Sequence, residues 1–337
     1  MYKNRVVLGL SDGVDSAVAA KLLLDQGYEV HGLYLNIAGG AGEREAKKSA
    51  EMLGIAFCAM DVSSEIEKHV CTPFAEGYLK GETINPCIGC NRNMKFEALL
   101  KYADEIEAQW IATGHYSVIE DGKIYAGHPD NDQSYMLCKL KREQIERLLL
   151  PLGGMKKEDV RNIAREMHLS VSEKPDSREI CFISGETYAS WLEKRENTPG
   201  EGDAVDNRNV FSKHDGIHRY TVGQRFGETE TGRRLYVSEI IAETNTLVLA
   251  LWEDLFKDEI FVRDVVWLSD DLVFPIEGVV RARHTRWEMP ECLITQEEDG
   301  RVKVKTKDKL RAPAKGQTAA FYIASRLIGG GTIDGWM

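Results

Sequence analysis

The sequence lacks the features of a membrane or secreted protein. It contains no run of about 18 apolar residues, the length that a membrane-spanning helix needs. Its first residues lead directly into a short strand pattern and do not have the layout of a signal peptide. Only 7 cysteines occur among 337 residues, an odd number that suits no disulfide framework. We therefore expect no membrane segment and a reducing compartment, by default the cytoplasm.

An excess of positive charge is also absent. The chain has 43 Lys and Arg against 54 Asp and Glu, a formal charge of −11. This balance argues against a general nucleic-acid coat protein, but a local basic face is enough to bind RNA phosphates. The alternation in residues 301–311 places basic side chains on one side of a strand. That strand is either an RNA-binding face or a solvated edge strand protected by lysines.

What is present indicates a globular protein of two or three domains, with 43% hydrophobic and 29% charged residues. The early part of the chain alternates between apolar strand patterns and helical patterns, which predicts an α/β domain with a parallel sheet and helices on both faces. The expected strands are residues 6–10, 29–35, 55–60 and 110–113, and the expected helices are residues 17–26 and 43–53.

Helical patterns dominate residues 133–196, and the character of the chain changes near residues 198–202. Short strands separated by turns follow, which indicates two small β modules. The expected strands are residues 218–222, 235–241, 246–251, 262–267, 278–284, 301–305 and 318–322. We therefore expect domains at residues 1–198, 199–269 and 270–337.

A candidate phosphate loop occupies residues 11–16, Ser-Asp-Gly-Val-Asp-Ser, between the first strand and the first helix. Backbone N–H groups converge at such a helix start, and small residues allow phosphates to approach. No Gly-Lys-Ser/Thr follows, so this is not a Walker A loop. It resembles the SGGxDS loop of the PP-loop ATP pyrophosphatases. The alternative is an ordinary strand-to-helix turn capped by Asp15 or Ser16.

Asp12 departs from that loop, in which the second residue is normally Gly. A carboxylate beside a pyrophosphate should repel it, at up to a few kcal/mol if water is excluded. We expect the side chain to turn away, to hold a metal ion, or to weaken ATP binding.

The cysteines suggest sulfur chemistry. Cys87 and Cys90 flank a turn shaped by Pro86 and Gly89, and Cys181 lies far along the chain. Sulfur insertion into RNA needs one cysteine to carry a persulfide and a second to attack it. Nearby basic residues, Arg92 and Lys95, would favour thiolates.

Two metal sites compete with this interpretation. Zinc needs four ligands, and only two adjacent thiols are present. An iron–sulfur cluster on Cys87, Cys90 and Cys181 would leave one iron open to bind sulfide. The four isolated cysteines are expected to be ordinary small buried residues; they are Cys58, Cys71, Cys138 and Cys292.

With these residues in place, the chain resembles the bacterial tRNA-specific 2-thiouridylase family over nearly its whole length. Besides the loop, the matching motifs are residues 81–92, 112–116, 132–135, 174–177 with 180–183, 223–225 and 329–333. The resemblance implies a PP-loop domain, a small central β domain and a C-terminal β-barrel, in agreement with the boundaries above.

The resemblance also implies roles. Cys90 would be the attacking and resolving nucleophile, and Cys181 the persulfide carrier. The residues around ATP would be Gly9, Leu10, Ser11, Asp12, Gly13, Val14, Asp15, Ser16, Leu35 and Gly114, with His115 beside them. The tRNA contacts would be Asn85, Pro86, Cys87, His115, Asn131, Asp132, Gln133, Arg281, Ala282 and Gln317.

The implied reaction uses ATP with Mg²⁺ to adenylate O2 of the wobble uridine of a tRNA. Sulfur from a donor protein or from sulfide then replaces that oxygen. The target base would have to leave the anticodon stack and enter a pocket.

Several departures leave a diverged paralog open as an alternative. Many family members carry Asp where Cys87 stands, Asn131 replaces a usual Lys, Ala282 replaces a usual Tyr, and the segment after Leu35 is shorter. Together with Asp12, they are compatible with altered ATP use, a different RNA or an iron–sulfur route. A third alternative is another PP-loop adenylating enzyme, such as an amide ligase, which would need no cysteine pair.

Overall fold

The computed structural model describes residues 2–37, 42–169, 171–174, 180–206, 209–283 and 289–337. By the contacts within it, the chain divides into two compact units. The first unit comprises Met1–Val70, Cys87–Phe182 and Ser325–Leu327, and the second comprises Cys71–Pro86, Ile183–Ala324 and Ile328–Met337. Among the described residues, no helix is both long and apolar enough to cross a membrane.

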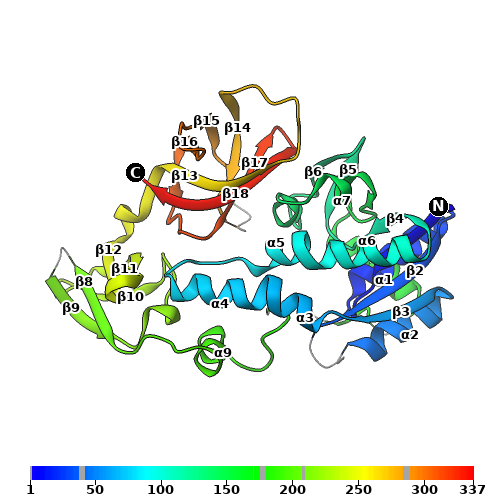
Figure 1. Cartoon of the computed structure of the whole chain (residues 1–337), viewed down its shortest axis with the longest axis horizontal. Coiled ribbons are helices and arrows are strands. Elements are labelled where there is room, and N and C mark those ends of the chain that lie inside the picture. Colours follow the sequence, from blue (N-terminus) through cyan, green and yellow to red (C-terminus); the bar gives the residue numbers. More distant parts are fainter. Residues whose placement is uncertain (1, 38–41, 170, 175–179, 207–208, 284–288) are drawn as a thin grey trace. The chain divides into compact units, whose positions relative to one another are not determined.

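A five-stranded parallel sheet forms the centre of the first unit, in the order β3-β2-β1-β4-β7 (Figure 1). Its strands are β1 (Tyr2–Gly9), β2 (Glu29–Asn36), β3 (Ala56–Asp61), β4 (Ala108–Ala112) and β7 (Leu148–Leu149). The order reverses at β1, so the carboxyl ends of β1 and β4 open at a topological switch point, where α/β proteins bind their ligands. The predicted parallel α/β sheet is confirmed.

Helices cover both faces of this sheet. One apolar core joins β1 to α1 (Val14–Asp25), α2 (Glu43–Leu53) and α8 (Lys157–Glu166) through alternate residues such as Val6 and Leu8. On the opposite face, Leu99 of α6 (Phe96–Glu105) lies 3.7 Å from the position that a Cβ on Gly9 would take. Alternate strand residues point to opposite faces, which places α6 across the sheet from α1.

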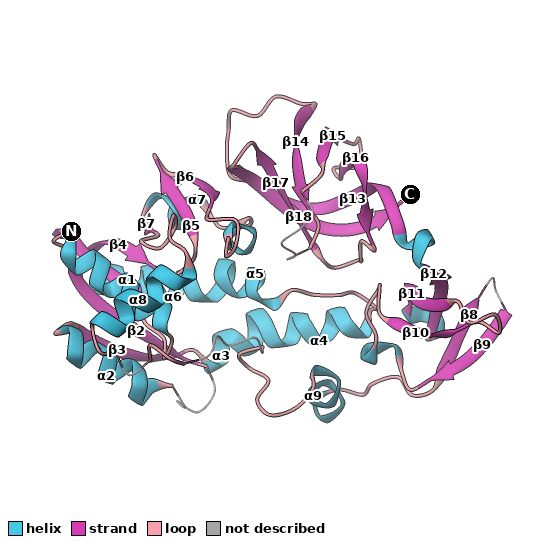
Figure 2. Cartoon of the chain, turned by 180° about the vertical axis from the view of Figure 1, so that it is seen from behind, coloured by secondary structure: helices cyan, strands magenta, loops and turns pink. Residues whose placement is uncertain are grey.

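The other elements that lie wholly or mostly in the first unit are short (Figure 2). They are α3 (Ser63–Ile66), the π-helix η1 (Glu67–Cys71), α5 (Pro86–Cys90), the π-helix η2 (Asn91–Lys95), β5 (Ser117–Glu120), β6 (Lys123–Ala126), the 3₁₀-helix η3 (Ser134–Leu137) and α7 (Arg142–Glu146).

The second unit contains α4 (Thr72–Leu79), α9 (Tyr188–Arg195) and two β structures. Aromatic side chains join the two helices: the Phe74 and Trp191 ring centroids are 6.0 Å apart, and those of Tyr78 and Tyr188 are 4.9 Å apart. The domain expected at residues 1–198 would include both helices, whereas the first unit's central segment ends at Phe182. The expected boundaries remain a prediction.

The first β structure of this unit is a five-stranded sheet in the order β10-β11-β12-β8-β9. Its strands are β8 (Gly202–Asp206), β9 (Asn209–His214), β10 (Arg225–Glu228), β11 (Arg234–Ile241) and β12 (Thr246–Leu251). The strand predicted at residues 218–222 was wrong. A 3₁₀-helix, η4 (Ile217–Arg219), begins there and buries Ile217 and His218.

The second β structure is a closed antiparallel barrel of six strands, which confirms the predicted fold. Pairing runs β13-β16-β15-β14-β17-β18, and β13 also pairs with β18 to close the ring. The strands are β13 (Phe256–Trp267), β14 (Ile276–Arg281), β15 (Glu291–Gln296), β16 (Val302–Arg311), β17 (Thr318–Ile323) and β18 (Arg326–Trp336). Its first strand therefore lies before residue 270.

The lysine-rich strand β16 is not an edge strand, because it pairs with β13 on one side and β15 on the other. Two of its lysines are held by carboxylates: Lys303 Nζ lies 3.0 Å from Glu259 Oε2, and Lys307 pairs with Glu291. The edge-strand explanation of its lysines was wrong, and an RNA-facing role remains a prediction.

Candidate active site

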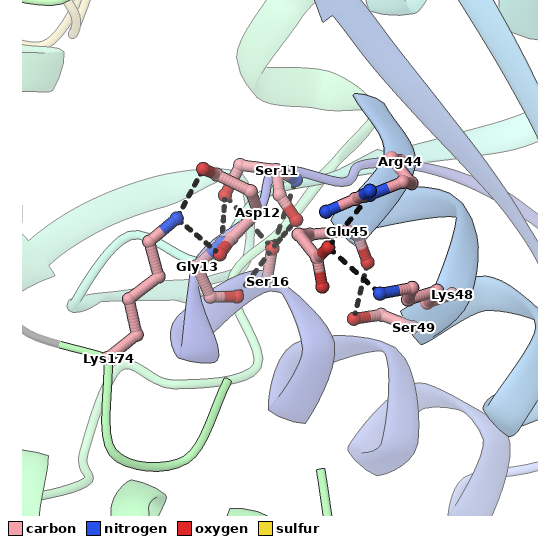
Figure 3. A network of polar contacts seen from close by, with 9 residues as sticks. All are labelled: Ser11, Asp12, Gly13, Ser16, Arg44, Glu45, Lys48, Ser49 and Lys174. Carbon is pink, nitrogen blue, oxygen red and sulfur yellow. Dashed lines mark hydrogen bonds and ion pairs between the residues drawn. The ribbon is translucent and has the colours of Figure 1, made fainter. Parts of the chain in front are cut away.

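The loop after β1 is held by its own serines (Figure 3). The Ser11 N–H donates to Ser16 Oγ at 3.0 Å, and the Gly13 N–H donates to Ser11 Oγ at 3.2 Å. Helix α1 begins at Val14 with Gly13 as its N-cap, and no side chain caps it. The first N–H groups of α1 therefore keep the positive potential of a helix start, which suits an anion.

Asp15 is an anchor within the first turn of α1. Lys157 Nζ lies 2.8 Å from each of its carboxylate oxygens, and the Tyr116 hydroxyl donates to Oδ1 at 2.6 Å. Both partners come from distant parts of the chain, and Lys157 is the first residue of α8. These contacts tie the loop to α8 and to the residue after the Gly114-His115 pair.

Asp12 is paired with Lys174, the first residue of the 174–177 motif, to which the sequence analysis gave no role. Lys174 pairs with the Asp12 carboxylate, and its Nζ also donates to the Asp12 carbonyl oxygen at 3.2 Å (Figure 3). The two side chains remain about two-fifths exposed, at 43% and 40%. The negative charge of Asp12 is therefore balanced by a cation at the loop itself.

Other expected nucleotide residues surround this loop. Gly114 follows β4, and a Cβ there would lie 3.1 Å from the backbone nitrogen of Ser16, so a larger residue would push into the loop. Leu10 is buried and donates its N–H to the Leu33 carbonyl at 2.9 Å. Leu35 lies on β2 opposite Met60 of β3.

The three cysteines of interest share one neighbourhood in the first unit. Cys90 ends α5 and is buried, whereas Cys87 and Cys181 are exposed. Burial raises the pKa of the Cys90 thiol to about 11; Lys95 opposes the rise, and the nearby Cys181 and Cys87 add to it. Desolvation and Cys87 likewise raise the pKa of Cys181, against the charge of Lys95. At neutral pH the Cys90 thiol is protonated.

The two expected cations differ in what they do. Lys95, at the end of η2, acts on both Cys90 and Cys181 through its charge. Arg92 donates instead to the carbonyl oxygen of Lys139, while its own carbonyl accepts from Gln144 Nε2 at 2.7 Å. Lys95 is thus the cation that favours the thiolates, and Arg92 braces η2.

No metal centre is assembled by the described part of the chain. It contains no group of three or more His, Cys, Asp or Glu side chains placed to hold an ion. Cys87, Cys90 and Cys181 all belong to that part, and they are not placed around a single ion.

His115 is a neutral side chain beside this neighbourhood. Its Nδ1 shares a hydrogen bond with Thr113 Oγ1 at 2.7 Å, and its ring stacks on Phe96 with centroids 6.1 Å apart. Desolvation, aided by the charge of Lys95, lowers the pKa of His115 to about 3. The imidazole is therefore uncharged at neutral pH.

The expected RNA contacts at residues 131–133 are occupied in holding a turn. Asn131 Nδ2 donates to the Met155 carbonyl at 3.0 Å, and Asp132 Oδ1 accepts from the Gly127 N–H at 2.7 Å. Gln133 Oε1 accepts from the Tyr116 N–H at 3.1 Å. Their side chains shape the segment beside Tyr116.

Several expected RNA contacts lie in the second unit. Asn85 and Pro86 end its segment 71–86, immediately before Cys87 in the chain. Arg281 and Ala282 lie at the end of β14 and are only 5% and 6% exposed. Gln317 accepts the Ile333 N–H through its carbonyl oxygen at 2.7 Å.

Comparisons with known proteins agree with this architecture. A family model described as the tRNA methyl transferase HUP domain matches residues 4–185. The accompanying PRC-barrel domain model matches residues 191–250, and an aminomethyltransferase β-barrel domain model matches residues 257–333.

Relatives match over the full chain. The tRNA-specific 2-thiouridylase MnmA 1 of Clostridium tetani is 40% identical over 98% of this chain and 97% of its own length. The tRNA-specific 2-thiouridylase MnmA of Clostridium perfringens is 39% identical over 99% of both chains. Among solved structures, NMN synthetase from Francisella tularensis aligns with a TM-score of 0.37 and 19% identity, over 52% of this chain and 67% of that chain, too weakly to carry an argument.

The fold and the loop define a PP-loop protein with two appended β structures. Within that class, the chain belongs to the tRNA-specific 2-thiouridylase family.

Proposed function

We propose that this protein is an ATP-dependent sulfurtransferase that converts a tRNA uridine to 2-thiouridine at the wobble position. The observation that carries the proposal is the shared neighbourhood of Cys90 and Cys181 in the unit that also holds the phosphate loop. A PP-loop enzyme that only adenylates its substrate, such as an amide ligase, needs no such pair of thiols. The alternative of an amide ligase is therefore disfavoured.

The activation step uses the loop at residues 11–16. The uncapped start of α1 supports binding of the ATP phosphates, with Mg²⁺ as their counter-ion. Uridine O2 attacks the α-phosphorus of ATP, so that pyrophosphate leaves and O2 becomes an adenylate. Gly114 keeps the neighbouring backbone close, and neutral His115 adds no charge that would hold the products.

The sulfur step uses the two cysteines. A donor protein, or sulfide with an oxidant, loads Cys181 as a persulfide. The Cys90 thiolate attacks the inner sulfur, the Cys90–Cys181 disulfide forms, and hydrosulfide leaves. Hydrosulfide then attacks C2 of the activated uridine and AMP departs. An external dithiol reduces the disulfide and restores both thiols. Lys95 favours the thiolate that this sequence requires.

Binding of tRNA is proposed to involve residues of both units. The candidates are Asn85, Pro86, Cys87, His115, Asn131, Asp132, Gln133, Arg281, Ala282 and Gln317. Because Asn131, Asp132 and Gln133 already hold a turn, we propose that the segment meets RNA through its surface shape. We place the protein in the cytoplasm, where its seven free cysteines would stay reduced.

The test is reconstitution with unmodified tRNA, Mg²⁺-ATP and a sulfur source, followed by mass spectrometry of the nucleosides. We expect 2-thiouridine together with tRNA-dependent release of pyrophosphate. Pyrophosphate release without thiolation would point to a different adenylated substrate. If neither product forms with any tRNA, the proposal is wrong.

A second candidate is an iron–sulfur-dependent thiolase, which the closeness of Cys87 to the other two thiols favours. Among the described residues these three thiols do not surround a single metal ion, so we route no step through a cluster. Anaerobic purification and reconstitution with iron and sulfide decide the matter: protein that thiolates tRNA while colourless and iron-free excludes the cluster.

A diverged paralog without adenylation was suggested by Asp12. The pairing of Asp12 with Lys174 weakens that argument, because the added negative charge is balanced.

A further inference from the structure

The loop at residues 11–16 contains no lysine, although a nucleoside triphosphate carries several negative charges. Most cations near it are engaged by carboxylates. Lys157 is paired with Asp15 at 2.8 Å. Arg44 and Lys48 are paired with Glu45 at 3.2 and 3.0 Å (Figure 3). The Lys157 pair is also the more covered one, with side chains 24% and 30% exposed. A phosphate would have to take one of these cations from its partner.

Lys174 is the cation that already contacts the loop backbone, whereas Arg44 and Lys48 both pair with Glu45 of α2. Its pair with Asp12 is about two-fifths exposed, and exposed ion pairs contribute about 0–1 kcal/mol, so exchange of one anion for another is easy. Lys174 Nζ also donates to the Asp12 carbonyl oxygen at 3.2 Å, a contact that survives any change of the side chain at position 12.

The backbone of Lys174 is itself held in place. Arg161 of α8 donates to the Ser172 carbonyl at 2.8 Å and to the Lys174 carbonyl at 3.1 Å. Helix α8 is in turn tied to the loop through Lys157 and Asp15. The backbone that carries the Lys174 ammonium is therefore fixed beside the loop by hydrogen bonds. A chance contact between surface side chains would not need such support.

We propose that Lys174 is a phosphate-binding residue of the nucleotide site, and that Asp12 competes with the nucleotide for it. The proposal rests on the function proposed above. ATP phosphates displace the Asp12 carboxylate from Lys174, while the bond to the Asp12 carbonyl keeps the ammonium beside the loop. Asp12 thus lowers nucleotide affinity in two ways, by repulsion and by occupying the cation.

The experiment measures binding of Mg²⁺-ATP, and of inorganic pyrophosphate alone, by calorimetry. The proteins are the natural chain, Asp12→Gly, Lys174→Met and the double variant. We expect Asp12→Gly to bind up to about fivefold more tightly, since an exposed charge contributes up to about 1 kcal/mol. We expect Lys174→Met to lose affinity in both backgrounds, and to lose more in the Asp12→Gly background, where nothing competes for the lysine.

The double variant decides between two roles. If Lys174 merely neutralises Asp12, removing it from the Asp12→Gly protein leaves affinity for ATP and pyrophosphate unchanged, and that result overturns the proposal. Asp12→Asn repeats the comparison without the backbone freedom of Gly. If Asp12→Gly or Asp12→Asn binds no more tightly than the natural chain, the competition is refuted.

A matched control is Lys21→Met. Lys21 forms a comparable exposed pair with Asp25 at the far end of α1, and its loss should leave binding unchanged. Thermal unfolding checks that each variant is folded, and Lys174→Gln replaces Lys174→Met if the latter is not. If no folded variant binds ATP, the proposed function fails as well; if all bind it equally, only the Lys174 assignment fails.

Discussion

The phosphate loop and the cysteine neighbourhood lie in the same unit but differ in how their polar groups are satisfied. In the loop, Asp12 and Asp15 each have a lysine partner, and the serines occupy backbone N–H groups. Around the cysteines, a single lysine opposes a strong desolvation of Cys90. The loop is charge-balanced before any ligand arrives, whereas the Cys90 thiol is held in its unreactive, protonated form.

This difference implies that nucleotide binding and sulfur transfer place different requirements on the protein. Nucleotide binding requires only an exchange of anions at a formed loop. Sulfur transfer requires the Cys90 proton to leave, so substrate binding must change the surroundings of the thiol. The predictions below test each side of this comparison, from the largest expected effect to the smallest.

The largest effect is expected on replacing either cysteine. Cys90→Ser and Cys181→Ser should each lower 2-thiouridine formation by at least about a thousandfold, because neither step has a substitute thiol. Nucleoside mass spectrometry measures the product, and pyrophosphate release should persist. Cys58→Ser is the control, since Cys58 lies on β3 and its polar contacts are with the Ala59 carbonyl and Tyr102. Full activity of either test variant would remove that cysteine from the mechanism.

The protonated state of Cys90 predicts a steep pH dependence of its alkylation. With a pKa of about 11, the thiolate fraction should rise about a hundredfold from pH 8 to pH 10, against about four- to tenfold for a free thiol of ordinary pKa. Peptide mass spectrometry of the iodoacetamide-treated protein follows this residue, with glutathione as the reference. Lys95→Met should slow the reaction further. A free-thiol profile would mean that Cys90 is not desolvated.

Loss of the Asp15 anchor should be felt in stability as well as binding. Asp15→Asn weakens the contacts with Lys157 and Tyr116, and we expect a loss of about 1–3 kcal/mol in the free energy of unfolding. Urea denaturation measures it, and ATP affinity should fall in the same variant. Asp25→Asn, which affects only an exposed pair on α1, should change stability by less than about 0.5 kcal/mol.

The smallest effect at neutral pH concerns His115, whose contribution appears only on acidification. Its pKa is depressed to about 3 in the folded protein, so between about pH 6.5 and pH 3 the unfolded chain binds one more proton. Stability is therefore lost as the pH falls through this window, by up to about 1.4 kcal/mol per pH unit. His115→Asn should flatten the slope by that amount in urea titrations at several pH values. Parallel curves for the two proteins would show that the pKa of His115 is not depressed in the folded protein.

Much of the first unit was predictable because its signals are local. The helix at residues 43–53 has the expected bounds, and the strands at residues 29–35 and 55–60 agree with β2 and β3 to within one residue at either end. The strand predicted at residues 218–222 failed because Ile217 packs into the sheet core from the 3₁₀-helix η4, and Val222 packs there from the turn that follows. A short apolar run cannot tell these cases apart.

The candidate site was only partly predictable. Residues 11–16 and the Cys87–Cys90 pair are motifs of neighbouring residues, so the sequence alone locates the loop and these thiols. The lysine partners of Asp12 and Asp15 could not be predicted in this way, because Lys174 and Lys157 lie 162 and 142 residues away in the chain. The predicted effect of Asp12 assumed an unbalanced charge, and only the fold reveals its counter-ion.

The sequence by itself determined the alternation of strands and helices in the first 60 residues, the position of the phosphate loop and the kind of chemistry that the cysteines offer. These depend on periodicity and on residue type, which act over a few positions. Tertiary structure decided which lysine balances which aspartate, that Cys181 lies near Cys90, and that Cys90 is protonated while His115 is neutral. Those properties arise from burial and from charges brought together by folding, and no local pattern encodes them.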